Sequence, residues 1–298
     1  MKKKNIAIIF FLAALVSSCA QMGPLAQIGA VLGQTAGVFS AETAAAISKS
    51  GVAWKNAFEE ITPEQEYYIG RAVAANVLAA YRLQTNKPGL VSYLNRICNA
   101  LAVNSPRPDI FNGYHVNLLD SNEINAFATP GGHIFITRGL IECTTSEDTI
   151  AAVLAHELAH IQLQHGLKAI KNSRITNALV VTGTSAVSAV TNTMELESIF
   201  SDSVGEIFTA MVTNGYSRTQ ETDADSVAMS LLALAGYEPS SLIEMLRVLE
   251  KDQPGHPGGF NKTHPTPAQR ITNAQRTVGK YDVDDTRSYR RTRYAAAI

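Results

Sequence analysis

The chain of 298 residues contains little cysteine, little tryptophan and little charge. Its three cysteines are too few for a disulfide-rich scaffold, or by themselves for a zinc cluster made of cysteine. Charged residues make up 17% and the formal net charge is −1, so we expect no nucleic-acid partner. The hydrophobic fraction of 46% excludes global disorder, and the length is ample for a packed core.

A long apolar run is also nearly absent, except at the N-terminus. Lysines at positions 2–4 precede an apolar stretch over 6–16, which is typical of a signal peptide and short for a bilayer core of about 30 Å. Small residues and then Cys19 follow, as in the lipobox of bacterial lipoproteins; the alternative is an ordinary signal peptide with a chance cysteine. We predict a signal peptide over 1–18 and lipidation of Cys19. Because Ala20, not aspartate, follows, we expect an anchor in the periplasmic leaflet of the outer membrane.

Residues 19–58 form a segment rich in glycine and alanine, and we expect a lipidated tether there. Gly29, Gly33 and Gly37 recur every four residues, so a helical stripe for close packing in lipid is the alternative. Glycine weakens helices, which favours the tether.

The remaining pattern predicts one mostly helical α+β domain over 59–279 and a polar, solvated tail over 280–298. A contact of the tail arginines with membrane headgroups is the alternative for that last segment. A strand is expected over 114–119, and Pro130-Gly131-Gly132 predicts a hairpin between 125–128 and 133–137. Helical patterns cover about 62–81, 90–103, 147–165, 174–191, 220–235, 240–251 and 267–278.

The helical pattern after residue 147 carries the sequence His156-Glu157-Leu158-Ala159-His160. Residues four apart lie on one face of a helix, so both imidazoles can reach one ion. Glu157 then lies beside the open coordination position, where it can take a proton from water. This HExxH arrangement predicts one catalytic Zn²⁺ per chain, with Glu157 as the general base.

A catalytic zinc usually has three protein ligands, so a third ligand must come from elsewhere. Glu221 and Asp225 are again four apart on a predicted helix. Glu221 can bind the metal while Asp225 accepts a hydrogen bond from a ligand histidine and fixes its tautomer. Surface carboxylates at an acidic helix start are the alternative, and spacing alone does not decide between them.

The order of these motifs, followed by Thr263-His264-Pro265 and Arg270, resembles the CAAX-prenyl-protease-like zinc metallopeptidases of the HtpX/BepA/LoiP group. The resemblance extends over most of 60–278 and is closest to the soluble bacterial lipoproteins of that group. It implies a gluzincin-type peptidase fold, Zn²⁺ as cofactor and Glu221 as the third ligand. It also places His264 and Arg270 near the zinc, either as donors to the oxyanion of the intermediate or, for His264, as a fourth ligand that blocks the resting enzyme.

The resemblance implies a substrate-binding edge strand before the active-site helix, either at Asn125, Ala126 and Phe127 or at its partner over 133–137. It also implies a metalloendopeptidase that cleaves misfolded or misassembled envelope proteins. One alternative is a zinc-loaded, chaperone-like lipoprotein that binds clients and has little resting proteolysis. Another is a structural lipoprotein whose site holds no metal.

Several features remain open in the sequence. Gly205 and Gly215 make 195–217 a candidate lid over the site. Cys98 and Cys143 would be in an oxidising compartment, but spacing cannot show whether they pair. The remaining histidines are expected to be packed or solvated, not ligands: His115, His133, His165 and His256.

Overall fold

The computed structural model describes residues 60–168, 170–172, 204–205, 207–251, 259–264 and 267–298, with isolated positions before residue 56. The parts 62–167 and 204–298 form one compact unit, and the fold below is that of this unit. Several predictions lie outside the described residues: the signal peptide 1–18, Cys19, Gly29, Gly33, Gly37, the helix over 174–191 and His256. Among the helices described, none has the length and apolar character needed to cross a bilayer.

Three short strands form the sheet: β1 (His115–Leu119), β2 (Ala126–Ala128) and β3 (His133–Thr137). Their order is β1-β3-β2, with β3 parallel to β1 and antiparallel to β2. The hairpin between β2 and β3 is confirmed, and its connection η3 (Pro130–Gly132) is the predicted Pro-Gly-Gly turn. Since β3 is the central strand, only β2 remains of the two candidates for a substrate-binding edge.

The predicted helices are confirmed wherever the structure describes them, and the α+β, mostly helical class is confirmed with them. Thr62 starts the first helix through a capping box with Gln65, as its sequence predicts. The six helices are α4 (Pro63–Ala80), α5 (Pro88–Ala102), α7 (Glu147–Gln162), α10 (Arg218–Leu234), α11 (Ser241–Lys251) and α13 (Pro267–Thr277). The structure adds α6 (Arg138–Cys143), η4 (Thr209–Asn214), α12 (Phe260–Thr263), η5 (Val278–Lys280) and α14 (Arg287–Ala297).

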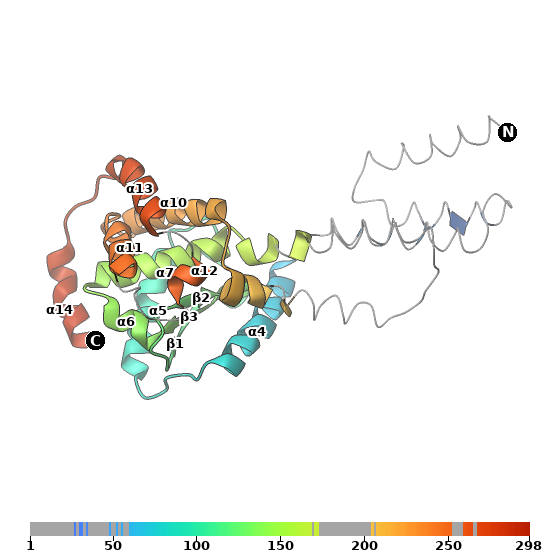
Figure 1. The fold of residues 1–298 in the computed structure, drawn as a ribbon, viewed down its shortest axis with the longest axis horizontal. Coiled ribbons are helices and arrows are strands. Elements are labelled where there is room, and N and C mark those ends of the chain that lie inside the picture. The colour runs from blue at the N-terminus through green and yellow to red at the C-terminus, as the bar shows by residue number, and fades with distance from the viewer. Residues whose placement is uncertain are drawn as a thin grey trace. The chain divides into compact units, whose positions relative to one another are not determined.

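Helix α7 runs through the centre of the unit. It packs between the sheet and the helices α10 and α11, with α5 against it as well (Figure 1). Every residue from Glu147 to Ile161 is buried, including the polar ones. A buried polar side chain needs partners, so the polar residues of α7 require specific ligands or counter-charges.

Two glycines allow α4 to approach the turn η3 closely. A Cβ added at Gly70 would lie 1.7 Å from the Pro130 carbonyl oxygen. Gly131 has φ of 70°, and a Cβ there would lie 2.5 Å from the Tyr67 Cα. The turn before β3 is therefore held against α4 by backbone contact that leaves no room for a side chain.

Replacing Gly70 by alanine is expected to lower the free energy of unfolding by at least about 1–3 kcal/mol, because the backbone of η3 must shift to admit the methyl group. Urea unfolding followed by circular dichroism measures the change. Gly89→Ala is the matched control, since a Cβ at Gly89 meets nothing within 4 Å. Equal stability of the two variants would contradict the close approach.

Residues Arg287–Ala297 of the tail are mostly exposed, as expected, but Arg290 among them is buried. These residues form α14, which packs against α7 and α5 (Figure 1). Arg290 is buried and donates to both carboxylate oxygens of Asp148, at 2.8 and 2.7 Å. Arg293 makes an ion pair with the fully buried Glu147. The tail arginines thus balance the charges of two carboxylates buried in the first turn of α7. In the sequence these carboxylates lie more than 140 residues before the arginines.

Acid is expected to weaken the ion pair between Glu147 and Arg293. Burial alone would raise the pKa of Glu147, but hydrogen bonds from Arg293, Tyr93 and Tyr237 outweigh it and hold the pKa below 4.5. A carboxyl group with a lowered folded-state pKa stabilises the fold above its unfolded pKa and loses this contribution as the pH falls through the folded value. The free energy of unfolding should therefore fall less steeply below pH 4.5 in Glu147→Gln than in the unaltered chain. If the free energy of unfolding of the two chains falls in parallel as the pH is lowered, the prediction is contradicted.

The two cysteines within the described unit do not form a disulfide. Neither Cys98 nor Cys143 is part of a disulfide, so the pairing that the sequence left open is not made. Cys98 lies in the core, and burial raises the pKa of its thiol to about 12. It therefore serves as a small apolar side chain.

Candidate metal centre

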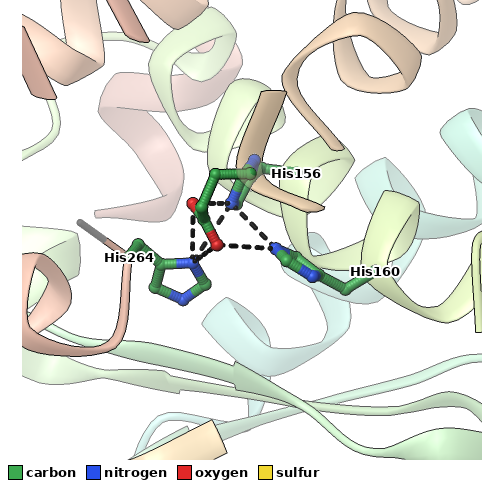
Figure 2. A group of neighbouring side chains, drawn as sticks. His156, His160 and His264 are labelled. Carbon is green, nitrogen blue, oxygen red and sulfur yellow. Dashed lines mark hydrogen bonds and ion pairs between the residues drawn. The ribbon is translucent and has the colours of Figure 1, made fainter. Parts of the chain in front are cut away.

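Helix α7 places His156 and His160 one turn apart on the same face. Their ring centroids lie 4.7 Å apart, and their Nε2 atoms lie 3.1 Å apart. Figure 2 shows both rings pointing toward one place. Both side chains are nearly inaccessible to solvent. The structure thus brings together the two histidines of the HExxH sequence as the helical spacing predicts.

Glu221 meets this pair from α10. Ser217 caps that helix through a capping box, and Glu221 lies in its first turn. Its Oε2 lies 3.4 Å from His156 Nε2, and its Oε1 lies 3.5 Å from His160 Nε2. The side chain that the sequence offered as a third ligand therefore reaches both histidines.

His264 completes a group of four. It follows α12, and its Nδ1 lies 3.0 Å from Glu221 Oε1 and 3.2 Å from His156 Nε2 (Figure 2). One ligand atom from each of the four residues lies within 4.8 Å of the other three, and all four residues are buried. Three imidazole nitrogens and a carboxylate oxygen so close together suit a four-coordinate divalent ion such as zinc.

Asp225 and Arg270 lie directly behind this cluster. Asp225 Oδ1 is 3.1 Å from His156 Nδ1, the ring nitrogen that points away from the other ligand atoms. Arg270 donates to both oxygens of Asp225, at 2.8 and 2.6 Å, and its Nη1 lies 3.0 Å from Glu221 Oε2. Asp225 can thus orient His156, and the guanidinium neutralises both buried carboxylates.

The charges of the cluster follow from burial and from these neighbours. Burial and Arg270 would lower the pKa of His156, but Asp225 and Glu221 outweigh them and raise it to about 9. Burial holds the pKa of His160 well below 6.5. For Glu221 the effect of burial is overcome by His264 and Arg270, which keep its pKa well below 4.5. Glu221 is therefore ionised, as a metal ligand must be, whereas His156 must lose a proton when it binds a metal ion.

Glu157 differs from the other carboxylates of the site. Burial raises its pKa above 4.5, although His264 and His156 act in the opposite direction. Neither of its oxygens has a hydrogen-bond partner among the described residues, and the Nε2 atom of His264 lies 3.5 Å from Oε1. A buried carboxylate with a raised pKa beside a metal site has the properties of a general base.

Sequence reasoning missed the roles of two neighbours of His160. His165 was expected to be packed or solvated, and it is buried, but its Nδ1 lies 2.9 Å from His160 Nδ1. Tyr216 stacks on the His160 ring at 4.1 Å between centroids. Gln164, with φ of 53°, turns the chain after α7 and so directs His165 back toward the site. Only the short distance from His160 to His165 in the sequence signalled this contact.

The other described histidines lie elsewhere. His115 and His133 are paired across β1 and β3, with ring centroids 6.2 Å apart, and neither belongs to the metal-ligand group. Burial lowers the pKa of His133.

The candidate substrate edge is covered in this structure. Residues Ala126–Ala128 of β2 are buried, and η4 packs against the strand. The Phe260 N–H donates to the Ile124 carbonyl at 2.7 Å, and Thr263 Oγ1 donates to Asn125 Oδ1 at 3.3 Å. The segment that carries His264 therefore also covers the strand before the active-site helix.

Comparison with known proteins agrees with this geometry. Residues 90–278 match the peptidase family M48. Metalloprotease LoiP of Escherichia coli K12 is 30% identical over 59% of this chain and 66% of its own length. Mitochondrial metalloendopeptidase OMA1 of Schizosaccharomyces pombe is 23% identical over 72% of this chain and 61% of its own. The beta-barrel assembly-enhancing protease of Escherichia coli K12 is 24% identical over 64% and 39% respectively.

The chain spans less than two thirds of the length of each of these relatives. The matched segment nevertheless contains the HExxH helix, Glu221, His264 and Arg270. The resemblance found in the sequence motifs is confirmed, since the matching family is one of peptidases. With its buried cluster of three histidines and a glutamate, this chain belongs to peptidase family M48.

Proposed function

We propose that the chain is a zinc-dependent endopeptidase at the periplasmic face of the bacterial outer membrane, anchored through Cys19. The observation that carries the proposal is the buried group of His156, His160, Glu221 and His264 beside an unpaired Glu157. The names of two relatives, a metalloprotease and a beta-barrel assembly-enhancing protease, support misfolded or misassembled envelope proteins as substrates. The lipobox at Cys19 supports the location.

In this proposal His156, His160 and Glu221 hold the ion. A zinc ion held by such ligands lowers the pKa of water toward about 7 and polarises a carbonyl group. Glu157 takes the proton from the attacking water and passes it to the leaving amine, for which its raised pKa suits it. Asp225 orients His156, and Arg270 keeps both carboxylates ionised.

Chelation tests this proposal on the full chain with casein as an unfolded substrate. We expect hydrolysis to stop when 1,10-phenanthroline removes the metal and to return when Zn²⁺, but not Mg²⁺, is added. Mass spectrometry of the fragments should show cleavage at internal peptide bonds. Hydrolysis that is insensitive to the chelator would refute the proposed metal dependence.

One observation favours a second candidate function. His264 lies among the ligand atoms, where a fourth protein ligand leaves no coordination position for substrate. The strand β2 is covered by the same segment. In this second function the chain is a zinc-loaded, chaperone-like lipoprotein that binds clients and has little resting proteolysis.

His264→Ala separates these possibilities. If His264 blocks the site at rest, the variant should hydrolyse casein faster, by about tenfold if one molecule in ten is open in the unaltered chain. If His264 instead stabilises the oxyanion, the rate should fall. His115→Ala is the control, because His115 lies on β1 outside the ligand group and should leave the rate unchanged.

A further inference from the structure

We propose that the hydroxyl group of Tyr216 is the hydrogen-bond donor for the carbonyl oxygen of the peptide bond that is cleaved. The proposal rests on the peptidase function proposed above and adds a catalytic residue to it. It follows from the position of Tyr216, from the lack of an acceptor for its hydroxyl group and from the contacts that Arg270 and His264 make elsewhere in the site.

Tyr216 is fixed beside the metal-ligand group by four contacts. Its ring stacks on that of His160, with centroids 4.1 Å apart and planes 20° apart. Its ring centroid lies 5.7 Å from that of His165 and 6.1 Å from that of His264. Its backbone N–H donates to the Thr263 carbonyl at 3.0 Å. The side chain therefore has a defined orientation within the site, as a preorganised donor requires.

The hydroxyl group of Tyr216 lacks an acceptor among the described residues. The residue is 8% exposed, and its oxygen is buried without a hydrogen bond. Buried hydroxyl groups nearly always have a partner, so this exception indicates a ligand that brings an acceptor. A phenol has an ordinary pKa of about 10, so the group is protonated at neutral pH and can donate.

The side chains that were candidates for this role are engaged elsewhere. Arg270 donates two hydrogen bonds to the carboxylate of Asp225 and forms an ion pair with Glu221. His264 lies among the ligand atoms. The Tyr216 hydroxyl group, in contrast, makes no hydrogen bond with any described residue.

A carbonyl oxygen of the substrate is the acceptor that fits this donor. In peptide hydrolysis this oxygen becomes negatively charged when water adds to the carbon, and Glu157 holds the proton taken from that water. A neutral phenol next to the developing charge donates a hydrogen bond that strengthens as the charge forms. When the amine leaves, the carbonyl group re-forms, and Tyr216 retains its proton throughout.

Tyr216→Phe tests the proposal in the full chain, because phenylalanine keeps the ring that stacks on His160. We expect kcat on casein-derived peptides to fall about 10²–10³-fold, with KM nearly unchanged and the zinc content unchanged. The affinity for a phosphinic peptide, which imitates the tetrahedral intermediate, should fall to a similar degree. Tyr114→Phe is the control: it also removes a buried hydroxyl group, which donates to the Arg107 carbonyl, and should leave both values unchanged.

The outcomes separate this proposal from the proposed function. An unchanged kcat and inhibitor affinity in Tyr216→Phe, in a chain that the chelator inhibits, would overturn the role of Tyr216 alone. Zinc loss in the variant would show that the hydroxyl group supports the metal site and would likewise overturn it. If the unaltered chain shows no proteolysis, the peptidase proposal fails, while the inhibitor affinity of the zinc-loaded chain still decides for or against Tyr216.

Discussion

Replacing Glu157 by glutamine is expected to lower kcat for casein hydrolysis by about 10³–10⁴-fold without loss of zinc. The amide has the size of the carboxylate but cannot accept the proton from water. Because Glu157 has no hydrogen-bond partner among the described residues and lies outside the metal-ligand group, the substitution removes no hydrogen bond of the described fold. Initial rates, together with metal analysis of the same preparation, measure both effects.

Glu142→Gln provides the matched control. Its carboxylate lies on the surface in an ion pair with Arg138 and is 61% exposed, so the rate should not change. Hydrolysis by Glu157→Gln at the unaltered rate would contradict its role as the base. If Glu157→Gln binds unfolded clients and protects them from aggregation as well as the unaltered chain does, the client-binding function is favoured over proteolysis.

Replacing Arg270 by methionine is expected to lower the free energy of unfolding of the metal-free chain by about 3–5 kcal/mol. The guanidinium is buried between Asp225 and Glu221, so its removal leaves two buried carboxylates without their counter-charge. Bound zinc supplies positive charge at Glu221, so the loss should be smaller when the metal is present. Urea unfolding with and without a chelator measures both values.

Arg276→Met is the control on the same helix, because Arg276 is exposed near the end of α13. Surface substitutions of this kind usually change stability by less than about 0.5 kcal/mol. A loss of similar size in both variants would show that Arg270 does not balance the buried charges. If the loss of unfolding free energy in Arg270→Met is the same with and without zinc, the result would also contradict this role of Arg270.

The histidine pair of the proposed metal site could be predicted from the sequence because its geometry is local. Four residues make about one helical turn, so His156 and His160 had to share a face of any helix that included both. The same holds for Glu221 and Asp225 on α10. Periodicity could not show that the two helices face each other, and only the resemblance of the ordered motifs brought Glu221 to the histidines.

The contacts of Arg270 and Tyr216 were beyond sequence reasoning for a different reason. The sequence predicted that Arg270 lies near the zinc, but its charge partners are set by the packing of α13 against α10. Tyr216 follows η4, whose residues carry no periodic pattern. A side chain that reaches a site from an irregular segment has no regular spacing to the other site residues, so the sequence pattern cannot predict its contact.

The tail after residue 280 shows how composition misleads. Its arginines and acids suggested a solvated segment, because a charged stretch usually stays in water. Here Arg290 and Arg293 instead meet carboxylates buried in the first turn of α7. Nothing near Asp148 in the sequence indicates a need for a distant arginine, so this pairing could not be predicted.

Metal analysis of the purified full chain tests the central claim most directly. The account predicts one zinc ion per chain, and loss of that ion in Glu221→Ala and in His160→Ala while circular dichroism shows that the helices remain. A chain that binds no zinc even after incubation with the ion, or variants that keep one ion per chain, would contradict it.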